Sequence, residues 1–125
     1  MKLRLMSATA MGLLAASGFV GMAEAQGVTG DECRDGVDDM GNVIDSALEC
    51  GDDAEATAIS ATALGDRAMA TAQSATAVGF LAEAKAFGGT ALGDRAKVLE
   101  GADDSVAIGR EAVVAAGTDR SIAIG

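Results

Sequence analysis

The sequence from residue 52 onward consists of a short repeat that ends in glycine. Five consecutive segments fill residues 52–125 without remainder, three of 14 residues and two of 16. Each segment ends in alanine, an aliphatic residue and glycine, and the closing glycines are Gly65, Gly79, Gly93, Gly109 and Gly125. Self-similarity at a fixed short period is typical of solenoids, in which every repeat is one coil that packs on the next. We therefore predict one five-coil domain over residues 52–125.

Inside each repeat the residue types alternate with a period of two, which indicates β-strands. Thr62 and Leu64 share one face of such a strand, while Ala63 takes the other. An alanine-rich helix is the alternative, because alanine has the highest helix propensity, but a glycine would interrupt that helix in every repeat. The predicted fold is an all-β parallel β-roll or solenoid, with two strands and two turns in each coil.

The large aliphatic residue before each closing glycine is expected to form the repeat core. These residues are Leu64, Val78, Leu92, Ile108 and Ile124. The closing glycines suit turns in which the backbone needs a positive φ or approaches another backbone closely. The two additional residues of each longer repeat fall within 101–104 and 117–120, so we expect them to lengthen loops on one side of the stack.

The repeats hold few large apolar side chains for their length, which points to self-association. Sixteen Val, Leu, Ile, Met and Phe residues occur in these 74 positions. Each stabilises the fold by about 2 kcal/mol when buried, against about 1–2 kcal/mol of backbone entropy lost per residue. Columns of alanine would let another sheet approach closely, so we expect a homo-oligomer with its contacts at or near these columns. The alternative is that the alanines pack a narrow interior.

Residues 1–25 have the pattern of a cleaved signal peptide. Lys2 and Arg4 precede an uncharged run at 5–22, and the Ala-Glu-Ala at 23–25 fits a small-residue cleavage site. The alternative is a membrane anchor, since the uncharged run is nearly long enough to span a bilayer. We expect the mature chain to be exported.

Residues 26–51 are expected to form an acidic cap on the first coil. Cys33 and Cys50 are the two cysteines of the chain, and an even number in an exported protein favours a disulfide. A stapled segment here would protect the first coil from edge pairing. Carboxylates clustered with Gly and Asn between the cysteines form a candidate calcium site, with a solvated acidic loop as the alternative. The candidate ligands are Asp35, Asp38, Asp39 and Asp45.

The composition argues against an enzyme and against a nucleic-acid-binding protein. The chain has no histidine, so it lacks the commonest general base and the commonest metal ligand. Its net charge of -10 repels phosphate backbones, whose binding requires clustered Lys and Arg. The acid pairs Asp52–Asp53 and Asp103–Asp104 are adjacent in sequence, so their side chains point apart and do not suit a two-carboxylate hydrolase.

The ends of the last two repeats resemble the head repeats of YadA-like trimeric autotransporter adhesins. They read Ser-Val-Ala-Ile-Gly at 105–109 and Ser-Ile-Ala-Ile-Gly at 121–125, and the resemblance covers residues 52–125. It implies a homotrimer of left-handed parallel β-rolls on the outer surface of a Gram-negative bacterium. Such a head attaches the cell to host extracellular matrix, to a cell-surface receptor or to other surfaces.

The chain departs from the family at its end and leaves one other function open. No neck, coiled-coil stalk or barrel anchor follows Gly125, so we expect a fragment or an unanchored, secreted head, with membrane contact only through an anchor that this sequence lacks. The alternative function is a secreted solenoid that binds ice or a mineral surface. Thr62, Thr76 and Thr90 would form a ladder for it, which Val106 and Ile122 interrupt.

Overall fold

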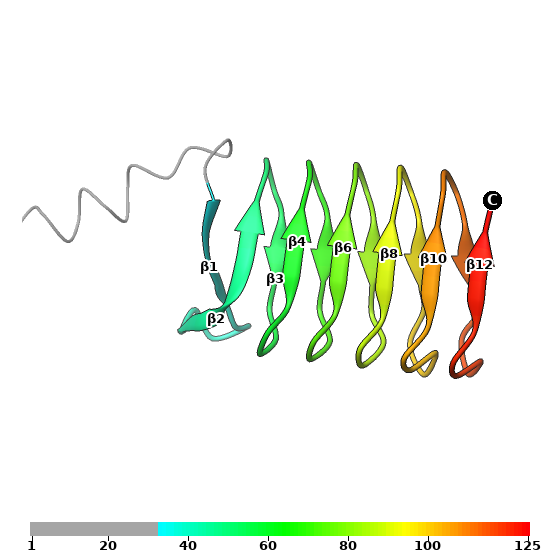
Figure 1. Cartoon of the computed structure of the whole chain (residues 1–125). Helices are drawn as coiled ribbons and strands as arrows, with labels where there is room; N and C mark the ends of the chain where they lie inside the picture. The colour runs from blue at the N-terminus through cyan, green and yellow to red at the C-terminus, as the bar shows by residue number, and fades with distance from the viewer. Residues whose placement is uncertain (1–32) are drawn as a thin grey trace, which may run out of the picture.

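A computed structural model describes residues 33–125, which form an elongated stack of coils behind an N-terminal hairpin (Figure 1). Each of the five coils contributes one strand to each of two sheets, and within each sheet the strands of the coils are parallel. The predicted parallel β-solenoid of 14- and 16-residue repeats is therefore confirmed. In the described part of the chain, no helix is long and apolar enough to cross a membrane. The predicted signal peptide, residues 1–25, lies outside the described residues.

The larger sheet contains the hairpin and one strand from every coil. Its spatial order is β1-β2-β4-β6-β8-β10-β12; β1 and β2 are antiparallel, and all later neighbours are parallel. The strands are β1 (Cys33–Val37), β2 (Val43–Cys50), β4 (Thr62–Leu64), β6 (Thr76–Val78), β8 (Thr90–Leu92), β10 (Val106–Ile108) and β12 (Ile122–Ile124).

The smaller sheet lies on the other side of each coil and contains five parallel strands in the order β11-β9-β7-β5-β3. Its strands are two residues long, shorter than the usual strand of about 5–6 residues, and turns take up most of each repeat. They are β3 (Glu55–Ala56), β5 (Met69–Ala70), β7 (Glu83–Ala84), β9 (Lys97–Val98) and β11 (Val113–Val114).

Alanine fills the space between the two sheets. In the larger sheet Ala63, Ala77, Ala91 and Ala107 are in register and have no exposed surface. In the smaller sheet the inward residues are Ala56, Ala70, Ala84, Val98 and Val114. The coil is thus a narrow prism whose interior holds, at most positions, one methyl group.

The prediction that the large aliphatic residues form the repeat core is wrong. Strand alternation places them opposite the buried alanines, and the narrow interior leaves no room for a side chain longer than valine. Four of them are 37–76% exposed, and Val78 is partly buried on the same outer face. The misplaced residues are Leu64, Val78, Leu92, Ile108 and Ile124.

The closing glycines form tight turns in which successive backbones nearly touch. Gly65, Gly79, Gly93 and Gly109 have φ between 114° and 137°. A Cβ on Gly79 would lie 2.5 Å from the carbonyl oxygen of Gly93 in the next coil. At these four turns glycine is therefore required both by the positive φ and by the close approach of the next backbone, as predicted. A Cβ on Gly125 would meet nothing within 4 Å.

The two longer repeats widen the turns between β9 and β10 and between β11 and β12, as predicted for 101–104 and 117–120. The aspartates of these turns bond to the coil before them. The Phe87 N–H donates to Asp103 Oδ1 at 3.1 Å, and the Asp103 N–H donates to Asp119 Oδ1 at 3.1 Å. Side-chain carboxylates therefore hold the wider turns in register.

We predict that Gly79→Ala destabilises the fold much more than Gly117→Ala. Both glycines have a positive φ, but an added methyl at Gly117 enters open space. The strained backbone alone costs about 1–2 kcal/mol, and at Gly79 the clash with Gly93 adds to that cost. Urea unfolding of both variants measures the difference, and equal losses would contradict the close stacking of the glycine turns.

Candidate interaction surface and N-terminal cap

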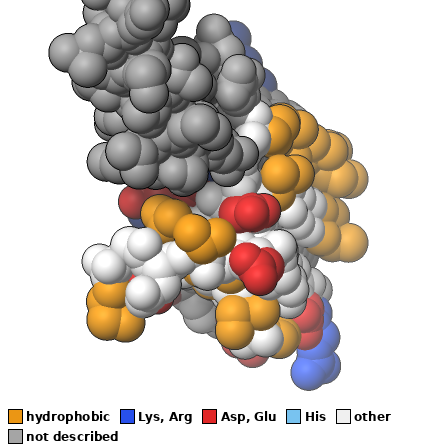
Figure 2. Space-filling model, turned by 90° about the vertical axis from the view of Figure 1, so that its left-hand side faces the viewer, with side chains coloured by type: hydrophobic (Ala, Val, Ile, Leu, Met, Phe, Trp, Pro, Cys, Tyr) orange, Lys and Arg blue, Asp and Glu red, His pale blue; other side chains and the backbone are white. Residues whose placement is uncertain are grey.

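The outward face of the larger sheet carries two straight columns of side chains. We name the first the aliphatic column: Leu64, Val78, Leu92, Ile108 and Ile124, aligned in register. The second is the threonine column: Thr62, Thr76 and Thr90, continued by Val106 and Ile122. Figure 2 looks along the stack and shows hydrophobic side chains gathered along the right-hand edge, on the side of the larger sheet.

On the larger sheet the aliphatic column, and not the alanine column, is exposed. The inward alanines of the two sheets have almost no exposed surface, so they cannot themselves touch a neighbouring chain, and the narrow-interior alternative is confirmed. A contact between copies near these columns stays a prediction. The aliphatic column is a row of apolar side chains that stay partly exposed in the single chain. A contiguous exposed apolar patch is typical of an interaction surface.

The outward face of the smaller sheet is polar in the middle coils. Glu83 accepts hydrogen bonds from the ammonium groups of Lys85 at 2.8 Å and Lys97 at 2.6 Å. These two contacts, led by the one from Lys85, hold the pKa of the Glu83 carboxyl below its ordinary value. Around Glu83 the two sheets therefore present different chemistry, with the aliphatic column on one side and ion pairs on the other.

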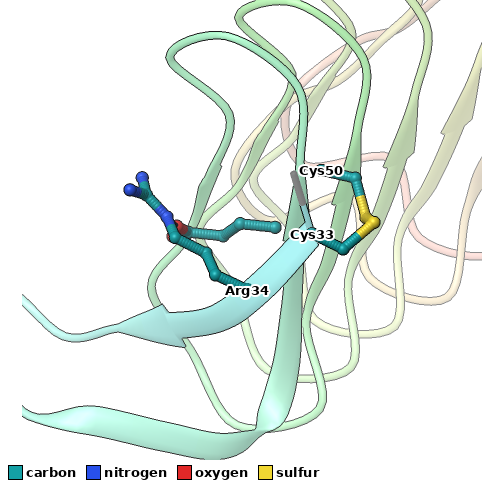
Figure 3. Close-up of a disulfide and its surroundings, with 4 residues drawn as sticks. Cys33, Arg34 and Cys50 are labelled. Carbon is teal, nitrogen blue, oxygen red and sulfur yellow. A yellow bond between two sulfur atoms is a disulfide. The ribbon is translucent and has the colours of Figure 1, made fainter. Parts of the chain in front are cut away.

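A disulfide closes the N-terminal hairpin, as predicted. Cys33 lies opposite Cys50 where β1 pairs with β2, their Cα atoms are 4.1 Å apart, and their sulfur atoms are bonded. Figure 3 shows the disulfide on one side of the hairpin and the Arg34 side chain on the other. The covalent link ties β1 to the strand that begins the parallel stack.

The end of β2 is a further rung of the solenoid. Leu48, Glu49 and Cys50 pair in parallel with the three residues of β4. Glu49 is opposite Ala63, so it occupies the alanine position, and it is almost completely buried. The in-register stack of the larger sheet therefore extends one strand N-terminal to the predicted boundary at residue 51.

The Glu49 carboxylate accepts two hydrogen bonds at the N-terminal end of the coil interior. Its Oε1 accepts the Ala56 N–H at 2.8 Å, and its Oε2 accepts Arg34 Nε at 2.6 Å. In later coils the corresponding N–H group donates to the preceding strand of the smaller sheet. β3 is the edge strand of this sheet, so its Ala56 N–H has no preceding strand to donate to. Glu49 thus supplies an acceptor to the edge strand, a role the sequence reasoning missed. The sequence feature that could have revealed this role is an acidic residue one repeat length, 14 positions, before Ala63.

The four candidate calcium ligands do not come together. Asp35, Asp39 and Asp45 are exposed, and within residues 33–125 no group of three His, Cys, Asp or Glu side chains could hold a metal ion. The Asp38 carboxylate accepts hydrogen bonds from the Asn42 side chain, the Asn42 N–H and the Met40 N–H. These bonds, above all those from Asn42, lower its pKa and shape the loop between β1 and β2.

We expect Glu49→Ala to destabilise the fold by about 1–3 kcal/mol, because the buried Ala56 N–H would lose its acceptor. Glu49→Gln keeps an acceptor at the same place and should lose less. Glu55→Ala is the matched control, since Glu55 is an exposed glutamate on the adjacent strand β3 and its removal leaves both Glu49 contacts intact. Urea unfolding of the oxidised chains measures all three, and a Glu49→Ala variant as stable as the parent would rule out this role.

The ion pairs of Glu83 should make stability depend on pH. The folded-state pKa of Glu83 is lowered, so the pairs stabilise the fold above the unfolded-state pKa of about 4.3. Their contribution disappears as the pH falls through the folded-state pKa. Between about pH 6 and about pH 3, the parent should lose more free energy of unfolding than Glu83→Gln. Identical losses in the two chains would contradict the pairing.

Comparison with known protein families identifies the same repeats that the sequence and the structure show. The sequence profile described as YadA head domain repeat matches residues 56–82, 84–112 and 101–125, which together make up more than half of the chain. Neither a search of curated proteins nor one of solved structures gave a match. The matched segments coincide with the coils whose alanine interior and glycine turns are described above. The chain belongs to the YadA head domain repeat family.

Proposed function

We propose that this protein is the head of a trimeric adhesin that attaches a bacterial cell to host extracellular matrix or to a cell-surface receptor. Heads of this family are non-enzymatic parts of trimeric autotransporter adhesins that are exported to the bacterial surface. A signal peptide at residues 1–25 fits that route. The observation that carries the proposal for this chain is the uncovered aliphatic column on the larger sheet.

A second and a third copy of the chain would cover this column. The column is straight because its residues are aligned strand by strand, so two parallel copies can bury it along the full length of the stack. Burial of apolar surface contributes roughly 25 cal/mol per Å². The smaller sheet, with its ion-paired Glu83, would then face outward together with the turns that precede the strands of the larger sheet. Receptor contacts would arise on those outward surfaces, and three copies would multiply their strength.

Binding to ice or to a mineral surface is the second candidate function. Thr62, Thr76 and Thr90 do align in register on an outer face, with the spacing of about 4.8 Å that neighbouring strands impose. The ladder lies beside the aliphatic column, however, and continues as Val106 and Ile122. Covering the larger sheet by other copies would remove the ladder from the surface. Thermal hysteresis of the assembled protein would favour this function over adhesion.

Leu92→Asp should turn the trimer into monomers without unfolding the coil. The substitution places one carboxylate per copy in the middle of the apolar contact, where an unpaired charge is strongly disfavoured. Val113→Asp is the control, because Val113 is 49% exposed on the smaller sheet, close to the 43% of Leu92. Light scattering should give three chains for the parent and Val113→Asp and one chain for Leu92→Asp.

The same three samples test adhesion. Avidity predicts that the assembled proteins bind matrix-coated surfaces or host cells at least about 100-fold more tightly than the Leu92→Asp monomer. Circular dichroism of the monomer checks that the strands persist. A parent chain that remains monomeric at all concentrations would contradict the assembly, and an assembled chain that binds none of these surfaces would contradict the adhesive function.

A further inference from the structure

The aliphatic column can hold copies together but specifies their alignment only weakly, and the threonine column beside it carries the same residue in coils 1 to 3. Its residues are leucine, valine, leucine, isoleucine and isoleucine, and they recur once per coil, about 4.8 Å apart. A copy that slides along the stack by one coil exchanges one aliphatic contact for another, at a small cost in packing. Weakly specified register is a general hazard of repetitive strands. A trimer with one defined alignment therefore needs a feature that differs from coil to coil.

Such a feature borders the column. The turns that follow the strands of the larger sheet form a continuous row along the top of Figure 1, and we name this row the turn rim. Each coil contributes two rim residues directly after the closing glycine of the coil before it. Counting the coils from residue 52, the pairs of coils 2 to 5 are Asp66–Arg67, Phe80–Leu81, Asp94–Arg95 and Arg110–Glu111.

The backbone holds these pairs at regular intervals. The Leu81 N–H donates to the Asp66 carbonyl at 3.0 Å, and the Arg95 N–H donates to the Phe80 carbonyl at 2.8 Å. The second residue of each pair has the same left-handed backbone, with φ of 55° at Arg67, 55° at Leu81 and 56° at Arg95. The rim positions are therefore geometrically equivalent, while their side chains are not.

The chemistry of the rim changes at coil 3. Phe80 and Leu81 are apolar and partly exposed, and Phe80 is 39% exposed. The pairs of coils 2 and 4 on either side are each an aspartate followed by an arginine. In coil 5 the order of charges is reversed, and Arg110 Nε lies 3.5 Å from Asp94 Oδ2. One apolar step thus stands between charged steps.

We propose that the turn rim fixes the coil-to-coil register between copies of this chain, a role that rests on the proposed trimer. In register, Phe80 and Leu81 of one copy meet the same apolar pair of the next copy. The aspartate of coils 2 and 4 then lies against the arginine of the neighbouring copy. A slip of one coil would place the apolar pair of each copy against an aspartate and an arginine. Those charges would lose water without gaining a partner, which disfavours the slipped alignment.

The test gives coil 3 the same rim pair as coils 2 and 4. The double variant Phe80→Asp/Leu81→Arg repeats the rim pair of coils 2 and 4, so the rim no longer distinguishes a one-coil slip there. The fold should tolerate it, because the same residue types already occupy the same backbone conformation at coils 2 and 4. Phe87→Asp is the matched control: it removes an aromatic side chain that is 49% exposed at the opposite turns of the same coil.

Register is read from disulfide cross-links between copies. Val78→Cys and Leu92→Cys, one coil apart on the aliphatic column, are introduced into separate batches that are mixed, refolded and oxidised. A disulfide needs Cβ atoms about 3.5–4.5 Å apart, so aligned copies should link 78 to 78 and 92 to 92, and slipped copies 78 to 92. Mass spectrometry of the peptides distinguishes these links.

On the parent rim and with Phe87→Asp, links between 78 and 92 should be rare. On the Phe80→Asp/Leu81→Arg background their share should rise by roughly tenfold, the factor that corresponds to about 1.4 kcal/mol. An unchanged share in an assembled double variant would overturn the role of the rim. A parent chain that is monomeric by light scattering would overturn the proposed trimer itself, and the rim proposal with it.

Discussion

The narrow space between the two sheets of each coil is the constraint on which the rest of the structure depends. With two- and three-residue strands joined by tight turns, the sheets enclose room for one methyl group at most interior positions. Alanine is the residue that fills this space without strain, and Val98 is the largest fully buried apolar residue among those described. Leucine and isoleucine are therefore forced outward, and a coil that is stable inside presents an apolar face outside.

The same narrow interior explains the cap. A stack of coils ends in a strand edge whose N–H groups need acceptors and in an open hydrophobic channel. The β1–β2 hairpin covers that end, and Glu49 is directed inward at an alanine position, where its carboxylate serves the Ala56 N–H. The long glutamate side chain fits there because no preceding coil occupies the space. Arg34 neutralises it from the hairpin, and the disulfide holds β1 in place.

Much of this architecture could be predicted from the sequence. The glycine period gave the coil boundaries, the two-residue alternation identified the strands, and an even number of cysteines in a chain expected to be exported indicated the disulfide. The inward face could not be predicted in the same way. Alternation requires Ala63 and Leu64 to point in opposite directions, but it does not say which is inside. The usual preference of leucine for the interior gave the wrong answer, because the width of the coil outweighs it.

The misses in the cap have a similar origin. Glu49 fits the repeat 14 residues before Ala63, but its ion pair with Arg34 depends on how β1 folds back along β2, which no local pattern specifies. The acidic residues between the cysteines suggested a calcium site because they are close together in the sequence. The sequence alone does not show the turn at residues 38–42, which directs their side chains. Asp38 directs its oxygens at Met40 and Asn42, and the hairpin spreads the other carboxylates apart.

The central claim is that alanines lie inside the coil and the aliphatic column lies outside it. Nuclear Overhauser contacts between methyl groups test this most directly, in a chain labelled at alanine, leucine, valine and isoleucine methyls. We predict an unbroken series of contacts from Ala63 to Ala77 to Ala91, and contacts across the coil to Ala70 and Ala84. Contacts from the Leu64 or Leu92 methyls to Ala70 or Ala84, on the opposite sheet, would contradict the claim and place the aliphatic residues in the core.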